Sequence, residues 1–434
     1  MFRLSRTILL FIAFSSAILF FVPTAQAILI LRDNPPAKSI VSGPLADSLT
    51  LAYKALSEGA LDLAERTFDE AGNIDPKSAE PYIGLAEVAM HRQEWPLVEP
   101  LLEKAIAIEP ENEIAFRAMG RYLFLQGNFA EAEVSFKQAL KITPKEPRLH
   151  IDLGDTYLKG LNDPKKAESA YRRAISLQKD HVLAHLGLAA SLAVQGDIQS
   201  AIDQYNLAAQ NAKGNPLPLH LLGRLYASQR RFDESLIALN RALKVSKNYV
   251  PAMLERGDVH VAKGELSLAL VDYQTVAKLE PTNAMTQFNM GTVYYTQKKW
   301  ALAEDSYEKA VDLDPNFYNA YNNLAWMAVE RHEQLDNGLR WIKRAIEISP
   351  DSANLYDTLG SVYIARGENQ LAVQALQKAT TRGTPRPSTL YRLGFAYAKI
   401  GNNVEATAAL QQALAISEVF PEVDAAKKLL TELE

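Results

Sequence analysis

A period of 34 residues runs through almost the whole chain. Proline marks it at regular places, namely Pro76, Pro110, Pro144, Pro281, Pro315 and, one residue late, Pro350. A period of this length is typical of short helical pairs that stack side by side into a solenoid. Such a solenoid leaves no room for a conventional catalytic domain, so the period predicts a binding scaffold.

Composition narrows the class of protein further. The chain has 434 residues, a net charge of −5 and no cysteine. The absence of cysteine excludes disulfides, thiolate zinc sites and a cysteine nucleophile. An acidic chain also argues against nucleic acid as a partner, because binding to phosphates needs a basic surface.

The N-terminus predicts export. Arg3 and Arg6 form a short basic region, 8–22 is almost wholly apolar, and Ala25-Gln26-Ala27 has the form of a cleavage site. Together these features indicate a secretory signal peptide over residues 1–27, cleaved after Ala27. The apolar run is short for a membrane span, which needs about 20 residues. We therefore expect a protein of the periplasm or cell envelope that meets the membrane only through its signal peptide. An uncleaved anchor is the alternative.

Residues 28–44 read as a linker, and two amphipathic helices are expected in every repeat after it. The expected repeats are 45–78, 79–112, 113–146, 147–181, 182–215, 216–249, 250–283, 284–317, 318–352, 353–386 and 387–420. The two longer repeats, 147–181 and 318–352, are expected to place their extra residue in the turn between their helices. Residues 421–434 read as a final capping helix. Four side chains stand where a first helix needs an N-cap: Ser78, Asn112, Asn283 and Ser352.

Each half of the repeat has its own motif. The first helix carries Leu-Gly and then Tyr three residues after the glycine, as at Leu153-Gly154 with Tyr157 and Leu222-Gly223 with Tyr226. The second helix carries Ala and then an aromatic residue four later, as at Ala132/Phe136. This spacing puts the small and the aromatic residues on one helical face, where small residues allow close approach and aromatic rings fill the gaps.

These motifs resemble the W-x2-L-G-x2-Y…A-x3-F…P signature of the tetratricopeptide repeat family. The resemblance covers Leu45 to about Phe420. It implies an all-α fold, a right-handed α-solenoid (superhelix) of eleven helix-turn-helix repeats.

No motif for chemistry appears in the chain. His181 and His185 are four residues apart, but no glutamate stands beside His181 as a zinc-protease motif requires. Nucleotide-binding and serine-hydrolase signatures are absent as well. Outside the signal peptide and the repeats, only the linker and the last helix are left to hold an active site. We therefore expect no enzymatic activity, no metal and no cofactor.

The resemblance implies that certain positions of each first helix line a concave groove that receives ligands. In two neighbouring repeats these positions combine aromatic rings with amides: Phe288, Asn289, Thr292, Tyr295, Asn319, Asn322, Asn323 and Trp326. Aromatic rings provide area to bury, and asparagine can both donate to and accept from a peptide backbone. These residues are the candidate groove for a protein or peptide partner. The alternative is that Trp326 packs against the neighbouring helix and the amides are solvated.

A second candidate patch is charged. Arg117, Arg121 and Arg148 could hold a carboxylate-bearing tail, because arginine binds carboxylates through two parallel hydrogen bonds. Pairing of these arginines with Asp152 and Asp155 across the repeat interface is the favoured alternative.

The sequence thus predicts a non-catalytic protein-binding scaffold of a bacterial envelope, in envelope assembly or polysaccharide export. Part of this rests on the resemblance, since exported tetratricopeptide proteins often belong to such systems. Two alternatives stay open. One is a structural scaffold that self-associates through its convex face and termini, and the other is a carbohydrate-binding protein.

Overall fold

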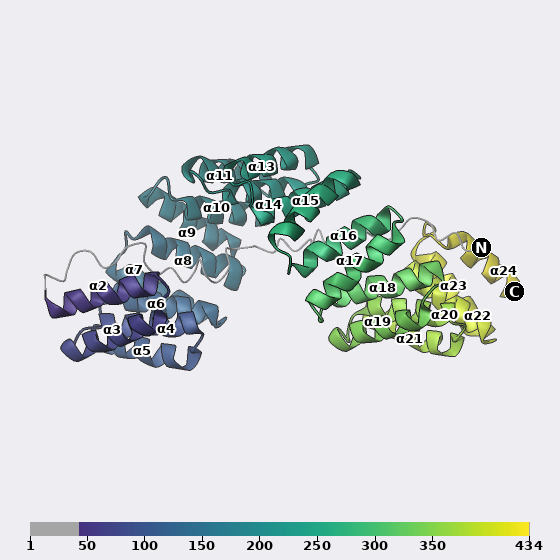
Figure 1. Cartoon of the computed structure of the whole chain (residues 1–434), viewed down its shortest axis with the longest axis horizontal. Helices are drawn as coiled ribbons and strands as arrows, with labels where there is room; N and C mark the ends of the chain where they lie inside the picture. Colours follow the sequence, from purple (N-terminus) through teal and green to yellow (C-terminus); the bar gives the residue numbers. More distant parts are fainter. Residues whose placement is uncertain (1–42, 434) are drawn as a thin grey trace. The chain divides into compact units, whose positions relative to one another are not determined.

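The computed structural model describes residues 43–433. The predicted signal peptide and the linker up to residue 42 lie outside this range. The described chain forms two compact parts, 43–246 and 247–433, which we call the N-terminal part and the C-terminal part. Both are all-α: 23 α-helices and one π-helical turn make up the described range, without any strand (Figure 1).

The helices of the N-terminal part follow one another with short turns. They are α2(Pro44–Ser57), α3(Leu61–Ile74), α4(Glu80–Arg92), α5(Trp95–Ile108), α6(Glu113–Leu125), α7(Phe129–Ile142), α8(Pro147–Asp155), η1(Thr156–Gly160), α9(Pro164–Leu177), α10(Val182–Val194), α11(Ile198–Asn211), α12(Leu217–Ser228) and α13(Phe232–Val245).

The C-terminal part continues in the same manner. Its helices are α14(Val250–Ala262), α15(Leu266–Leu279), α16(Ala284–Thr296), α17(Trp300–Leu313), α18(Tyr318–Arg331), α19(Leu335–Ile348), α20(Ala353–Ala365), α21(Asn369–Arg382), α22(Pro387–Lys399), α23(Asn403–Ile416) and α24(Val423–Leu433). None of the described helices is long and apolar enough to cross a membrane.

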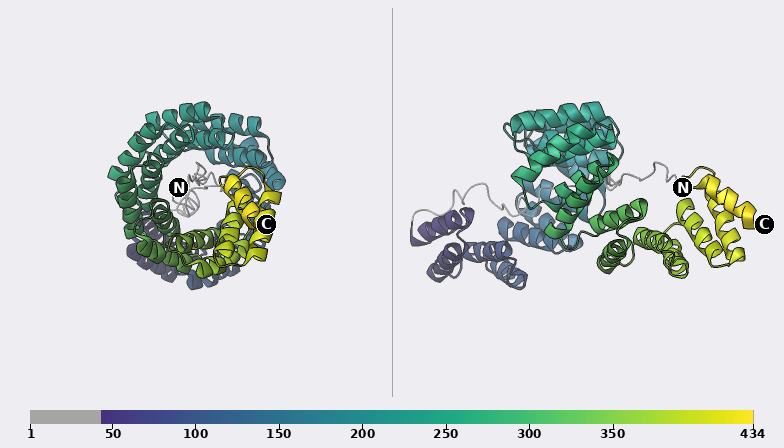
Figure 2. Two further views of the ribbon diagram at one scale, coloured as in Figure 1. Left: turned by 90° about the vertical axis from the view of Figure 1, so that its right-hand side faces the viewer. Right: turned by 45° about the vertical axis from the view of Figure 1, so that its right-hand side comes forward.

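Within each part, helices pack as successive pairs, each against the next (Figure 2). The first helix of a pair also touches the first helix of the next pair, as α18 touches α20, whereas the second helices make fewer contacts with one another. The more closely packed layer lies on the inside of a curve. The first helices therefore form the inner face of each part, and the second helices form the outer face.

The core lies between the two helices of each pair, where glycine meets an aromatic ring. Tyr171, Tyr273 and Tyr307 on second helices are among the largest fully buried side chains. A Cβ atom added to Gly291 would lie 2.7 Å from the ring of Tyr307, and one added to Gly154 would lie 2.6 Å from the ring of Tyr171. Glycine is thus what lets each aromatic ring enter the gap between the helices.

The extra residues of the two longer repeats are not in the turns, so that prediction was wrong. In the first of them, α8 has 9 residues and continues through the 5 residues of η1, whereas a first helix such as α16 has 13. In the second, α18 has 14 residues. A helix takes up one more residue by widening a turn or by adding to its end, and the connecting turn keeps its length.

Two of the four predicted caps form. Asn112 accepts a hydrogen bond from the backbone of Ala115, and Asn283 accepts one from Thr286. Ser352 stands at an N-cap position but its side chain makes no capping bond, and Ser78 lies one residue before Ala79, the N-cap of α4.

Candidate functional site

The predicted groove residues lie on two neighbouring first helices of the C-terminal part. Phe288, Asn289, Thr292 and Tyr295 are on α16, and Asn319, Asn322, Asn323 and Trp326 are on α18. Both helices belong to the inner face of this part. The structure therefore brings the two sets together on one surface.

The aromatic side chains of the groove are partly used in packing. The ring of Phe288 lies 5.7 Å from that of Tyr307 and 5.0 Å from that of Phe317, so Phe288 helps to seal α16 against α17. Tyr295 is half-buried, and its ring meets Trp300 edge-on at 5.3 Å. The hydroxyl of Tyr295 donates to Glu330. Burial and this carboxylate together raise the pKa of Tyr295 well above its ordinary value.

The amides form a line of hydrogen bonds along the inner face. Asn323 Nδ2 donates to the hydroxyl of Tyr307 at 3.3 Å, and that hydroxyl donates to Thr292 at 3.2 Å. Asn322 Nδ2 lies 3.5 Å from Asn323 Oδ1. Asn322 Oδ1 is buried and has no donor within residues 43–433. Among the groove residues, Asn319 is exposed.

A separate set of hydrogen bonds joins Asn289 to a carboxylate that the sequence reasoning missed. Asn289 Nδ2 lies 3.4 Å from Asp258 Oδ1, and the buried Tyr273 hydroxyl donates to the same oxygen at 2.5 Å. Burial raises the pKa of Asp258 to about 7, with Glu255 adding to the effect and the Tyr273 bond opposing it. The sequence offered one signal for this carboxylate. Asp258 directly follows the glycine of its first helix, and the second helix of the same repeat carries Tyr273.

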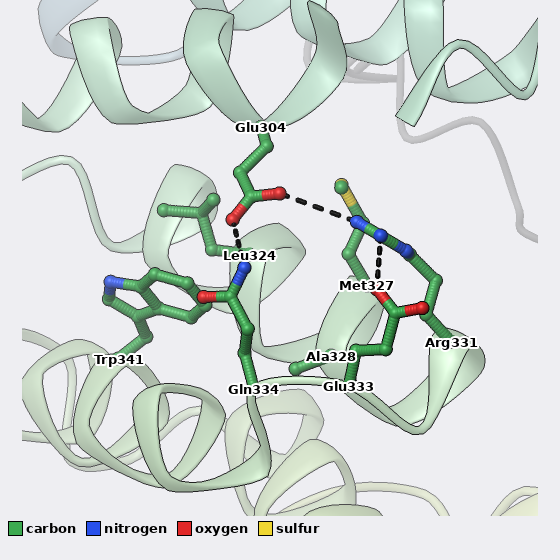
Figure 3. Close-up of a pocket in the computed structure, with 8 residues that line it drawn as sticks. All are labelled: Glu304, Leu324, Met327, Ala328, Arg331, Glu333, Gln334 and Trp341. Carbon is green, nitrogen blue, oxygen red and sulfur yellow. Dashed lines mark hydrogen bonds and ion pairs between the residues drawn. The ribbon is translucent and has the colours of Figure 1, made fainter. Parts of the chain in front are cut away.

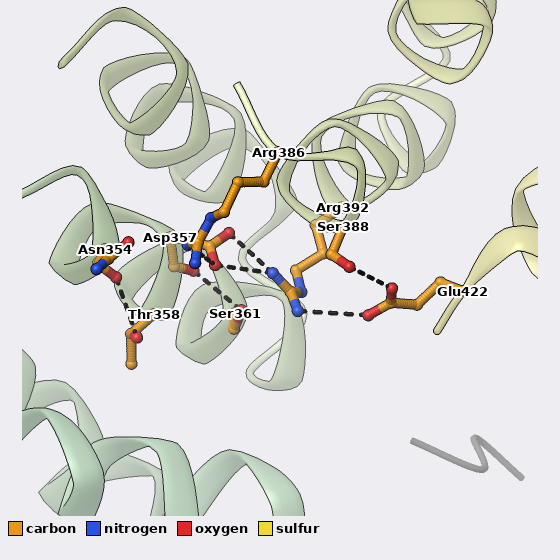
Figure 4. Close-up of polar contacts among 8 residues, drawn as sticks. All are labelled: Asn354, Asp357, Thr358, Ser361, Arg386, Ser388, Arg392 and Glu422. Atoms are coloured by element: carbon orange, nitrogen blue, oxygen red, sulfur yellow. Dashed lines mark hydrogen bonds and ion pairs between the residues drawn. The ribbon is translucent and has the colours of Figure 1, made fainter. Parts of the chain in front are cut away.

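Trp326 is half-buried and meets an arginine from another repeat. The guanidinium of Arg392 lies over its ring at 5.4 Å. Arg392 also pairs with Asp357 at 2.8 Å and with Glu422 at 3.4 Å (Figure 4). Arg386 forms a further ion pair with Asp357 at 3.2 Å. This network connects α18, α20, α22 and the residue before α24, and none of its charged members was among the predicted site residues.

In the N-terminal part, two of the three predicted arginines share one carboxylate. Arg117 and Arg121 pair with Asp152 at 2.9 and 3.1 Å, and their side chains are only 9% and 10% exposed. Burial would raise the pKa of Asp152, but Arg121 and Arg117 outweigh it and hold that pKa below its usual value. Arg148 lies in the first turn of α8, where its backbone N–H donates to Glu146. The favoured pairing therefore holds for Asp152, while Asp155 instead meets Lys159 and the hydroxyl of Tyr171.

One cleft of the described residues lies near the predicted groove helices. This shallow cleft between α17, α18 and α19 has an apolar floor of Leu324, Met327 and Trp341 (Figure 3). Its rim is an ion pair between Glu304 and Arg331 at 3.4 Å. Within residues 43–433, no group of three histidine or acidic side chains is placed to hold a metal ion.

Comparison with family models shows which family the chain belongs to. Tetratricopeptide repeat family models match residues 118–146, 148–216, 218–249, 257–298, 284–317, 306–336 and 358–418. The chain is a tetratricopeptide repeat protein. Its all-α solenoid fold, predicted from the sequence, is confirmed.

The curated relatives share little sequence identity with this chain and are longer than it. The chain is similar to the BBSome complex member BBS4 of Bos taurus, with 24% identity over 64% of this chain and 53% of that protein. It is also similar to the cellulose synthase operon protein C of Xanthomonas axonopodis pv. citri, with 26% identity over 61% of this chain and 16% of that protein. The human protein O-mannosyl-transferase TMTC1 shares 27% identity over 49% of this chain and 24% of its own length. The chain thus spans about half of BBS4 and a quarter or less of the other two.

Among solved structures, a tetratricopeptide repeat protein from Parabacteroides merdae matches with a TM-score of 0.45 and 21% identity, over 58% of this chain and 98% of that one. The family itself has a known role. Proteins built from the tetratricopeptide repeat mediate protein–protein interactions, so this chain belongs to a family of interaction scaffolds.

Proposed function

We propose that this protein is a non-catalytic scaffold of the bacterial cell envelope that binds an extended segment of a protein partner along the inner face of α16 and α18. The observation that carries the proposal is the half-buried pair of aromatic side chains, Tyr295 and Trp326, on that face. Half-buried aromatic rings are typical anchors of protein interfaces, because they have area still to bury and little entropy to lose.

The hydrogen-bonded amides support the same site. Asn323 and Thr292 are held by the hydroxyl of Tyr307, so they present a fixed arrangement to a partner. Asn322 Oδ1 has no donor among the described residues, and a rotation of this side chain would offer it to the backbone N–H of an extended peptide.

The envelope setting rests on the signal peptide predicted for residues 1–27. The similarity to a protein of a bacterial cellulose synthase operon agrees with a role in envelope assembly or polysaccharide export. The network of Arg392, Asp357 and Glu422 beside Trp326 would fix the far end of the groove.

The test is capture of partners from an envelope extract. The wild-type protein is compared with a variant carrying Phe288→Ala, Asn289→Ala, Asn323→Ala and Trp326→Ala. For a captured partner, Trp326→Ala alone is expected to weaken binding by about 2 kcal/mol, roughly 30-fold in Kd. Circular dichroism checks that each variant remains helical.

The matched control is Leu268→Ala with Leu302→Ala. These leucines are 51% and 48% exposed on second helices, so they also remove apolar surface but from the outer face. Equal binding by the wild type and the groove variants would refute the site. Loss of binding in the control alone would move the interface to the outer face.

A further inference from the structure

Two neighbouring second helices of the C-terminal part carry opposite excess charge on their outward faces, acidic on α17 and basic on α19, although Lys309 and Glu347 also lie there. The buried residues of α17 and α19 correspond with an offset of 35 residues, since Tyr307 matches Ile342 and Ala310 matches Ala345. On the outward face the same offset places Arg340 opposite Asp305 in register and Lys343 opposite Glu308. We call Asp305, Glu308 and Asp312 the acidic stripe, and Arg340, Lys343 and Arg344 the basic stripe; all six are exposed.

The stripes are not neutralised by each other within one chain. Neither Glu308 nor Lys343 makes an ion pair anywhere in the described range 43–433. Asp305 pairs with Lys309 at 2.7 Å and Arg344 with Glu347 at 3.1 Å, in each case along the same helix. Burial raises the pKa of Glu308, and the acidic neighbours Glu304, Asp312 and Asp305 add to this effect.

On the second helices to either side, the positions that correspond to Asp305 and Glu308 hold uncharged residues. Val271 and Gln274 occupy the positions on α15 that correspond to Asp305 and Glu308, and Gln374 and Gln377 occupy them on α21. The cleft with its floor of Leu324, Met327 and Trp341 lies at the junction of α17, α18 and α19 (Figure 3). That floor is largely covered within the chain, since Leu324 is 1% and Met327 3% exposed, so the surface is distinguished by its charge.

We propose that α17 and α19 form a self-association surface, on which the acidic stripe of one copy lies against the basic stripe of a second copy and the reverse. A second copy fits this surface because a two-fold axis between the stripes places each stripe against its complement twice. A partner of uniform charge would meet one of the stripes with like charge, which is repulsive.

Two charge reversals test the proposal in the full-length chain. Asp305→Lys/Glu308→Lys makes both stripes basic, and Arg340→Glu/Lys343→Glu makes both acidic. Each variant alone is expected to associate at least about 10-fold more weakly than the wild type in sedimentation velocity at low salt. An equimolar mixture of the two variants is expected to recover association, because every stripe then faces its opposite. Salt should weaken association of the wild type and of the mixture alike.

The matched control is Gln370→Glu/Gln374→Glu on α21. Both glutamines are exposed, so the change adds carboxylates to the neighbouring second helix without touching either stripe. It should leave association unchanged. If the chain associates through the apolar residues 8–22 instead, every variant will associate as strongly as the wild type. That result would overturn the proposal. A wild type that stays monomeric at about 100 µM in low salt, or a mixture that does not recover, would overturn it too.

Discussion

At the scale of single residues, the tyrosines of the second helices explain where several polar side chains stand. The hydroxyls of Tyr171, Tyr273 and Tyr307 each donate to the residue that follows the glycine of their partner helix. Those acceptors are Asp155, Asp258 and Thr292. A buried hydroxyl without a partner costs free energy, so a polar residue after the glycine accompanies each of these tyrosines.

Asp258 should make the C-terminal part less stable as the pH rises. Its pKa in the folded protein is raised to about 7, so the folded state holds a proton between about pH 4 and pH 7 that the unfolded chain has lost. The contribution of this group to the free energy of unfolding therefore falls across that window and is constant above it. Asp258→Asn keeps the side chain neutral. We expect the variant to match the wild type near pH 4.5 and to exceed it by on the order of 1–2 kcal/mol at pH 8.

Urea unfolding followed by tryptophan fluorescence measures this difference, because Trp300, Trp326 and Trp341 all lie in the C-terminal part. Asp155→Asn is the control. It removes an ion pair with Lys159 at 2.8 Å and should destabilise the N-terminal part at both pH values, as judged by circular dichroism. A variant at Asp258 that is less stable than the wild type at pH 8 would contradict the argument.

At the scale of the helix pair, the close approach of the first helix to the second decides stability. In several pairs the first helix lies close against the second because glycine leaves room for an aromatic or leucine side chain, as Gly257 does for Tyr273 and Gly360 for Leu376. In the two longer repeats the turn keeps its ordinary length, and the extra residue is taken up in the first helix, as in η1. The repeat therefore tolerates change in helix length more readily than change in the contact between its helices.

Gly291→Ala should test this close approach. The added Cβ would lie 2.7 Å from the buried ring of Tyr307, so the ring or the helix must move. We expect destabilisation of about 1–3 kcal/mol in thermal or urea unfolding.

Gly72→Ala is the matched control within a helix. Its added Cβ would lie 3.6 Å from Pro81, an ordinary contact, and alanine favours the helix by up to about 1 kcal/mol. The control should therefore be neutral or stabilising. The same loss of stability at both positions would mean that helix propensity, and not contact with Tyr307, sets the cost.

At the scale of the whole molecule, stability is the sum of contacts between neighbouring repeats, and polar side-chain contacts join these repeats on the inner face. Arg117 with Asp152, Tyr295 with Glu330 and Asp357 with Arg392 are each 35 residues apart. Each pair joins one first helix to the next, so the inner face is tied together by polar contacts as well as by packing. The groove proposed for a partner includes one of these contacts, the hydrogen bond from Tyr295 to Glu330.

The predicted signal peptide bears on the whole chain, because it predicts where the mature protein begins. If the signal peptide is cleaved after Ala27, the protein recovered from the envelope fraction of a bacterial host begins at Ile28. Mass spectrometry of the intact protein and N-terminal sequencing measure this directly. Ala25→Leu/Ala27→Leu, which removes the small residues of the cleavage site, should leave the precursor uncut. Processing of both forms at another residue would contradict the predicted site, and a wild type that keeps its N-terminus would favour the anchor.

The sequence by itself determined the helices and their pairing, and the resemblance to the repeat family implied the inner position of Phe288 to Trp326. The helices and their pairing follow from local periodicity, glycine and proline, which act over a few residues. Only the tertiary structure decided that Asp152 receives two arginines, that Arg392 lies between Trp326, Asp357 and Glu422, and that Asp258 is held by Tyr273 and Asn289. Most of those contacts join side chains on different repeats, about 30 to 35 residues apart or more. They depend on the register and spacing of packed helices, which the periodicity of a single helix does not fix.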